Sequence, residues 1–145
     1  MIKSSNEKGF SLIELLLVVA IIGIIAAIAM PALQKGIQAA ENSTIFATMR
    51  TISSSQVGFY SQNNRFGRLD ELNQILGNGL GTEISPRIVR RKFTFEMAGL
   101  GGLTPTDDDL RIEYTVTATR TVLMLGDVVY KYELTQTGEI VQILP

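Results

Sequence analysis

Apolar residues fill the N-terminal part of this sequence in one long run. The stretch Leu15–Leu33 holds only Leu, Val, Ile, Ala, Gly, Met and Pro, and apolar side chains continue on the other side of Glu14. About 20 apolar residues suffice for a helix to cross the hydrocarbon core of a bilayer. The pattern therefore predicts a membrane-spanning helix close to the N-terminus.

The helical period continues after this run, although the composition becomes mixed. We expect one helix from Phe10 to about Ser61, which at about 1.5 Å per residue would be about 78 Å long. Its outer half carries one apolar face, with polar residues elsewhere. The residues expected near this face are Ile37, Ile45, Met49, Ile52, Phe59 and Tyr60.

Two helix breakers lie inside the apolar half, Gly23 and Pro31. Pro31 removes one backbone hydrogen bond and its ring crowds the preceding turn, whereas Gly23 lowers helix propensity by about 1 kcal/mol relative to Ala. For the isolated chain we expect a mild kink that a membrane helix tolerates.

The middle and last thirds of the chain predict a smaller α+β head. Gly, Asn and Pro punctuate Gln62–Arg91, which we expect to be a connecting region with little regular structure, apart from a short helix over Asp70–Leu76 capped by Asp70. Thr137–Gly138 is expected to form a hairpin turn. Alternating apolar and polar residues predict four strands: Lys92–Met97, Arg111–Thr117, Val129–Leu134 and Glu139–Ile143.

These elements define the expected fold class. Four antiparallel strands pack against the outer half of the long helix, which gives an α+β fold with a single core. A short sheet alone would be only marginally stable, so the helix is expected to be part of that core.

Glu14 is the single acid in the apolar segment. A carboxylate in the membrane costs about 2.5–3.5 kcal/mol and usually has a partner. The positive end of the helix dipole favours an acid here by about 0.3–1 kcal/mol, which offsets only part of that cost. Between Phe10 and Lys35 the sequence contains no basic side chain. The one cation available there is the amine that a cut between Gly9 and Phe10 would create. A neighbouring copy is the more plausible donor of that amine, so Glu14 argues for assembly.

The sharp change in polarity lies before the apolar run. An ordinary secretory signal has a shorter apolar core that is followed by a small-residue cleavage site. Here a cut after Gly9 would leave the apolar segment in the mature protein, with a free amine on Phe10.

The segment Gly9–Leu16, followed by the apolar residues to Ala29 and by Pro31, closely resembles the class III signal of type IV pilins and type II secretion pseudopilins. The resemblance is strong over about Lys8–Leu33 and only architectural beyond. It implies cleavage after Gly9 by the prepilin peptidase, N-methylation of Phe10, and pairing of Glu14 with the amine of an adjacent subunit. It also implies that helicity between Gly23 and Pro31 can be lost when a filament assembles.

With this resemblance the chain is expected to have five parts. They are a leader (1–9), a transmembrane and filament-core half of the helix (10–33), an outer half (34–61), a connecting loop (62–91) and a sheet head (92–145). The expected partners are further copies of the chain in a helical filament, the prepilin peptidase and N-methyltransferase, and an inner-membrane assembly platform. The single-pass subunit is expected in a bacterial inner membrane before assembly and on the cell surface afterwards.

Composition narrows the chemistry of this chain. Its 145 residues include no Cys and no His, so disulfides, thiol chemistry and His-based triads or metal sites are excluded. Without residues 1–9, the chain keeps 11 basic and 13 acidic side chains, which is no global signature of nucleic-acid binding. The carboxylates show no recognisable pairing, and Ser53–Ser55 has no nearby base motif. We therefore expect no enzyme activity and no cofactor.

Four local features allow a second interpretation. Asp107–Asp109 suggests calcium, but three consecutive acids lack the alternate spacing that wraps one ion, and a solvated loop is expected. Asn42–Thr44 matches a glycosylation sequon on the predicted helix, where a glycan would block packing. The aromatic residues are ordinary in number and suit packing better than electron conduction. The basic cluster is expected to form a solvated edge or salt contacts between subunits rather than a DNA site, and it contains Arg87, Arg90, Arg91 and Lys92.

Three functions fit these expectations. The favoured one is a major pilin that builds surface filaments for adhesion, twitching motility or DNA uptake. The second is a secretion pseudopilin that builds a short periplasmic pseudopilus. The third is a minor pilin whose basic cluster, from Arg87 to Lys92, binds DNA or a surface.

Overall fold

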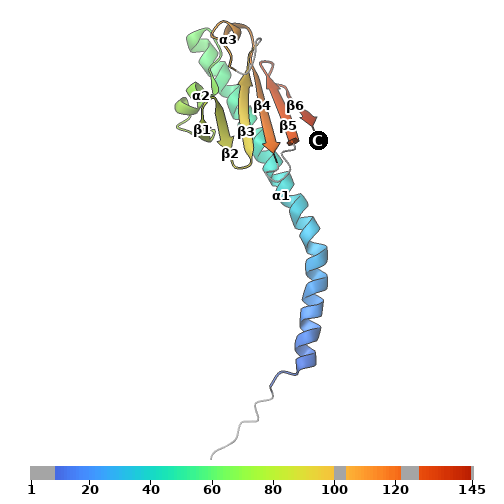
Figure 1. The fold of residues 1–145 in the computed structure, drawn as a ribbon. Coiled ribbons are helices and arrows are strands. Elements are labelled where there is room, and N and C mark those ends of the chain that lie inside the picture. The colour runs from blue at the N-terminus through green and yellow to red at the C-terminus, as the bar shows by residue number, and fades with distance from the viewer. Residues whose placement is uncertain (1–8, 100–103, 122–127, 145) are drawn as a thin grey trace, which may run out of the picture. The chain divides into compact units, whose positions relative to one another are not determined.

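The computed structural model describes residues 9–99, 104–121 and 128–144 (Figure 1). The chain divides into two compact units, residues 1–41 and residues 42–145. Most of the expected leader lies outside the described residues.

The first unit consists of the N-terminal part of helix α1, which runs from Leu12 to Asn63. The expected helix, Phe10 to about Ser61, differs from α1 by two residues at each end. Phe10 and Ser11 precede the helix, and every residue from Gly9 to Ala40 is exposed. Up to Leu33 this part of the helix is apolar on all sides, and no face of it is covered within the described chain.

The second unit, the head, contains the rest of α1 and a sheet (Figure 1). Ile45, Met49 and Ile52 repeat at intervals of three to four residues, which places them on one face of the helix. All three are buried and belong to the core cluster of the head. The outer half of α1 therefore packs against the sheet, as the sequence predicts, although Ile37 and Tyr60 are exposed.

The sheet has six antiparallel strands rather than the four expected, and they follow one another in chain order. This corrects the expected strand count and the expectation that Gln62–Arg91 has little regular structure, because the two extra strands lie there. The strands are β1 (Thr82–Ile84), β2 (Arg87–Arg90), β3 (Phe93–Ala98), β4 (Thr115–Thr121), β5 (Val128–Thr135) and β6 (Ile140–Leu144).

The two missed strands are short and carry a weak sequence signal. β1 has three residues and β2 has four, and Ser85–Pro86 separates them. Proline next to a short apolar run demotes a strand assignment by sequence. Only pairing with the longer β3, in which Ile88 lies opposite Phe95, adds this hairpin to the sheet.

Two short helices also adjust the expected elements. Helix α2 covers Leu69–Ile75, so Asp70 lies in its first turn instead of capping it. Helix α3 covers Asp109–Ile112, where the sequence suggested that a strand begins at Arg111. The hairpin turn at Thr137–Gly138 is confirmed, since the Gly138 amide donates to the Thr135 carbonyl (2.9 Å) and Gly138 has a φ of 79°.

One face of the sheet and the outer half of α1 form the core. The cross-strand row that starts at Ile88 shows this arrangement, because all of its central members are buried. They are Ile88, Phe95, Ala118 and Tyr132. Since alternate residues point to opposite faces, the intervening residues of β3 and β4 form the outer face, which is rich in threonine.

Candidate assembly site

The residues of the expected cleavage site lie just before α1. The backbone is not helical at Gly9 and Phe10, and the Phe10 side chain is 84% exposed. A Cβ atom added at Gly9 would have no heavy atom within 4 Å. Any requirement for glycine at this position therefore comes from a partner that reads the site, since the described fold itself leaves room for a side chain.

Glu14 caps the start of α1 from within the same chain. Its Oε2 atom accepts a hydrogen bond from the backbone N–H of Ser11 at 3.0 Å, and the Ser11 carbonyl accepts from the Leu15 N–H at 3.3 Å. This arrangement forms half of a capping box, in which the acid three residues after the N-cap satisfies an otherwise unpaired amide. The Ser-x-x-Glu spacing in the sequence is the signal for it, which the sequence analysis missed.

The cap satisfies hydrogen bonding but supplies no opposite charge. Among the described residues, Glu14 forms no ion pair with a Lys or Arg side chain. The described chain therefore places no basic side chain beside this carboxylate at the N-terminal end of an apolar helix. Ser11 and the helix dipole can hold it there, but an ammonium group at the same level would stabilise it further.

The surface behind this cap is apolar over several helical turns. α1 has a stretch long and apolar enough to cross a membrane. Its large side chains are exposed to a similar extent on all sides, for example Leu17 (59%), Ile25 (60%) and Met30 (63%). A helix that is hydrophobic all round needs an apolar environment, which a bilayer or other helices can supply.

The two expected helix breakers do not interrupt α1 in this structure. Both Gly23 and Pro31 are helical and exposed. A loss of helicity between them upon assembly stays a prediction.

The N-terminal segment also matches known proteins. Residues 4–30 match the family model of the prokaryotic N-terminal methylation motif. This segment is therefore similar to the N-terminal signal of type IV pilins. The match covers the expected cleavage site, the cap and most of the apolar run.

Three curated relatives extend the likeness beyond this segment. The type IV major pilin protein PilA of Myxococcus xanthus is 37% identical over 85 residues, which are 55% of this chain and 38% of that protein. A fimbrial protein of Moraxella nonliquefaciens is 47% identical over 62 residues, covering 43% of this chain and 38% of the relative. Fimbrial protein EcpC of Eikenella corrodens is 55% identical over 40 residues, covering 28% and 26%.

These matches are partial. The matched regions span less than two fifths of the length of each relative. No solved structure matches the chain. The likeness is therefore concentrated where the pilin signal lies, and the head must be interpreted from its own contacts.

The basic cluster of this chain lies on β2 and the following turn. The Arg87 guanidinium pairs with Glu96, and the Arg90 guanidinium donates to the Gly79 carbonyl at 2.9 Å. Arg91 lies at the turn with a φ of 56°. At least two of its cations thus already hold the β1–β2 hairpin to the rest of the head, which reduces the charge available to a phosphate backbone.

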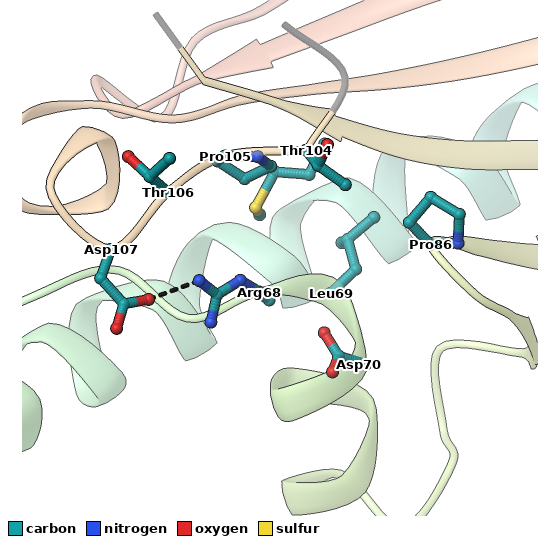
Figure 2. Close-up of a pocket in the computed structure, with 9 residues that line it drawn as sticks. Arg68, Leu69, Asp70, Pro86, Thr104, Pro105, Thr106 and Asp107 are labelled. Carbon is teal, nitrogen blue, oxygen red and sulfur yellow. Dashed lines mark hydrogen bonds and ion pairs between the residues drawn. The ribbon is translucent and has the colours of Figure 1, made fainter. Parts of the chain in front are cut away.

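The three consecutive acids each have a different structural role. Asp107 pairs with Arg68 beside a cleft of about 420 Å³ (Figure 2). Asp108 lies 3.5 Å from the Arg111 guanidinium, and the Asp109 carboxylate accepts bonds from the backbone N–H and hydroxyl of Thr106. No group of three potential metal ligands converges among the described residues.

An ion-pair network joins α2 to the end of α1. The Arg65 guanidinium donates to both oxygens of Glu71, at 2.8 and 2.6 Å, and Glu71 also accepts from the Arg68 N–H at 2.8 Å. The hydrogen bond from Arg65 lowers the pKa of Glu71, although partial burial opposes this shift. The same bond raises the pKa of Arg65.

The serine run Ser53–Ser55 lies on α1 and serves packing. Ser53 forms a hydrogen bond with Tyr114 that partly offsets the rise in the pKa of this phenol caused by burial. The Ser54 hydroxyl donates to the Thr51 carbonyl at 3.0 Å. The sequon at Asn42–Thr44 likewise lies within α1.

Proposed function

We propose that this chain is a pilin, a structural subunit that is cleaved after Gly9 and polymerises into a helical filament, with Phe10 to about Leu33 in the filament core. The observation that carries the proposal is the fully exposed apolar half of α1, which ends in an acid that has a cap but no countercharge. Both features become satisfied when several copies pack their helices together.

The attraction between subunits comes mainly from this apolar surface. Before assembly the helix lies in a bilayer, where lipid covers it and no hydrophobic force drives helices together. A filament that leaves the membrane would expose the same surface to water. Burying one Leu, Ile or Val side chain between neighbouring helices then contributes about 1.5–3 kcal/mol.

Glu14 sets the axial register of the filament in this proposal. Its partner is the N-terminal amine of Phe10 in a neighbouring copy, created by cleavage. The cap on Ser11 holds the carboxylate at the level of the helix start, which is also the level of that amine. Because the apolar surface is similar on all sides, only such a polar contact distinguishes one axial offset from another.

The finer assignments follow from the same proposal. The partners are the prepilin peptidase and N-methyltransferase, which would methylate Phe10, and an assembly platform in a bacterial inner membrane. The filament lies on the cell surface and serves adhesion, twitching motility or DNA uptake. Two relatives named fimbrial proteins and one named a major pilin support this role. Without His or Cys, the proposal includes no catalytic role.

N-terminal mass spectrometry of sheared surface material tests the assignment. An abundant chain that begins at methylated Phe10 in this material is the expected result. If processed chain stays in the membrane fraction and is absent from the sheared material, the pseudopilin or minor-pilin alternative replaces the surface-filament role.

Two substitutions at Glu14 separate its charge from its cap. Glu14→Gln keeps an acceptor for the Ser11 N–H and removes the charge, whereas Glu14→Ala removes both. If the amine pair sets register, both variants are processed and both yield at least tenfold fewer filaments than the parent chain. Filament yield is measured by shearing and immunoblotting. Normal yield from Glu14→Gln would show that only the cap matters and would contradict the charge pair.

A further inference from the structure

The two edges of the head sheet differ in length and charge. β1 is short and contains Glu83, whereas β6 contains neither a charge nor a proline over Ile140–Leu144. Val141, Ile143 and Leu144 in β6 are 48%, 45% and 39% exposed. Among the described residues, the outer edge of each strand pairs with no further strand.

An uncharged apolar edge strand invites pairing with another strand. Natural sheets usually protect such an edge with a Lys, a Pro, a bulge or a covering segment. The one irregularity here is a register shift between Lys131 and Tyr132 of β5, and three pairs of β6 continue beyond it. The exposed backbone groups and side chains of β6 are therefore an interaction surface.

The strand directions indicate what can pair there. With six antiparallel strands in chain order, β1 and β6 run in opposite directions. The free edge of β1 in a second copy can therefore lie antiparallel to β6, so that the sheet continues across the contact. This contact joins two different edges, and the right-handed twist of strands rotates each copy relative to the last. Such a heterologous contact builds an open helical array when it does not close into a ring.

Two cross-strand rows run from β1 to β6. In one common register, the β6 end of each row meets a similar residue at the β1 end of the same row in a second copy. On the outer face, the row begins with exposed Ile84 (59%) in β1 and ends with exposed Val141 (48%) in β6. Its members are Ile84, Arg87, Glu96, Thr117, Glu133 and Val141. On the inner face, the row through Ile88 and Tyr132 begins with Glu83 and ends with Gln142.

We propose that β6 of one subunit pairs antiparallel with β1 of a second copy, with Val141 beside Ile84 and Gln142 beside Glu83. This inference rests on the proposed filament, to which it adds a contact between heads. The register puts apolar beside apolar on the outer face and polar beside polar on the inner face, and it extends both rows without a break.

Cysteine crosslinking in assembled filaments tests this contact sharply because the chain has no Cys. The test variant carries Glu83→Cys and Gln142→Cys. Residues directly opposite in antiparallel strands have Cα atoms about 4.5–5.5 Å apart, within the disulfide range of about 4.4–6.8 Å. Mild oxidation of sheared filaments should produce a ladder of covalent multimers on a denaturing gel.

The controls separate this geometry from chance collisions. Each single variant should stay monomeric, and a mixture of the two single variants should stop at dimers. A pair of Gln142→Cys with Asp108→Cys, whose side chain is 90% exposed in the parent chain, should give no ladder. Dimers from one single variant alone would indicate that like edges pair, and would overturn the proposal.

A lysine on the edge supplies a second measurement. Val141→Lys in the double-cysteine chain should reduce the ladder at least tenfold, because a charge on an edge strand disfavours pairing. Thr117→Lys puts the same residue on the same row in mid-sheet and should leave the ladder intact. Equal ladders from both variants would overturn the edge contact.

The outcomes also distinguish this inference from the proposed function. Normal filaments without a ladder overturn the edge pairing and leave the subunit role standing. If the processed parent chain forms no filaments, both fall. A ladder in sheared filaments supports both.

Discussion

The two halves of α1 have the same secondary structure but opposite surroundings. Between Gly9 and Ala40 every side chain is exposed, whereas Met49 and Ile52 in the head have no exposed surface. The first half has apolar residues on all sides, and the second has them on one face. The difference shows that a helical sequence alone does not stabilise such a helix. The apolar surface that packs against the helix does so.

Polar groups show the same contrast. In the head, Gln56 is fully buried and both of its amide atoms are bonded, to the N–H (2.7 Å) and the carbonyl (2.8 Å) of Gly67. In the N-terminal unit, Glu14 has one hydrogen bond from Ser11 and no ion pair with a described side chain. Gln56 finds both partners within the head, so the stability of the head and the assembly of the filament should respond to different substitutions.

The largest expected effect separates cleavage from folding. Gly9→Val should abolish removal of the leader, because the peptidase is expected to require a small residue there. The matched variant Gly36→Val adds the same side chain at another glycine whose Cβ would meet nothing within 4 Å. Intact-mass spectrometry should find only uncleaved Gly9→Val chain and fully cleaved Gly36→Val chain. Efficient maturation of Gly9→Val would show that the site is read differently.

The second prediction makes the same substitution in both halves of the helix. Ile52→Ala removes side-chain atoms from a residue with no exposed surface and should lower the free energy of unfolding by about 2–5 kcal/mol. Ile25→Ala alters a side chain that is 60% exposed and should leave it unchanged. Denaturant titration of the detergent-solubilised chain, followed by near-UV circular dichroism of its tyrosines, measures both. Equal losses would mean that the two halves do not differ in stability.

The sequence predicts the elements that have a strong period and misses those that depend on a neighbour. The long helix is within two residues of its bounds at each end, because apolar spacing continues from the membrane segment to the face with Met49 and Ile52. The β1–β2 hairpin was missed, since strands of three and four residues beside Pro86 have little pattern of their own. These two strands form because the hairpin pairs with β3, and the local sequence does not predict this pairing.

The candidate site likewise contains residues that the sequence identifies and contacts that it does not. Its residue types and their spacing are local, so Gly9, Phe10 and Glu14 can be named from the sequence as cleavage and assembly candidates. The cap between Glu14 and Ser11 has a visible Ser-x-x-Glu spacing, but the sequence analysis did not predict it, because the unpaired amides of a helix start are not apparent from charge alone. The ion pairs of the basic cluster depend on Glu96, which lies on another strand, and could not be assigned from spacing.

The third prediction concerns the buried amide of Gln56. Gln56→Leu keeps the volume but leaves the N–H and carbonyl of Gly67 without partners, which should cost about 1–3 kcal/mol of unfolding free energy. Gln62→Leu, at an exposed position near the end of the same helix, is the matched control and should cost nothing measurable. The denaturant titration described for Ile52→Ala applies here. If Gln56→Leu lowers the unfolding free energy no more than the control does, packing alone holds the loop at Gly67.

The smallest expected effect is electrostatic and depends on pH. The Arg65 guanidinium lowers the pKa of Glu71, so this pair stabilises the folded head above the unfolded pKa of about 4.3. That contribution is lost as the pH falls through the lower, folded pKa. Glu71→Gln keeps the acceptor for the Arg68 N–H and should cost no more than about 1 kcal/mol at neutral pH, because the pair is partly exposed.

The difference in unfolding free energy between the parent chain and Glu71→Gln should therefore shrink as the pH falls below about 4. Glu113 is a partly exposed acid outside the Arg65–Glu71 pair. The variant Glu113→Gln therefore serves as the control at each pH. A Glu71→Gln deficit that stays constant from neutral to acidic pH would assign its effect to packing around α2. In that case packing rather than charge would hold α2 in the head. The contrast with Glu14, whose charge is proposed to set the filament register, would then be larger.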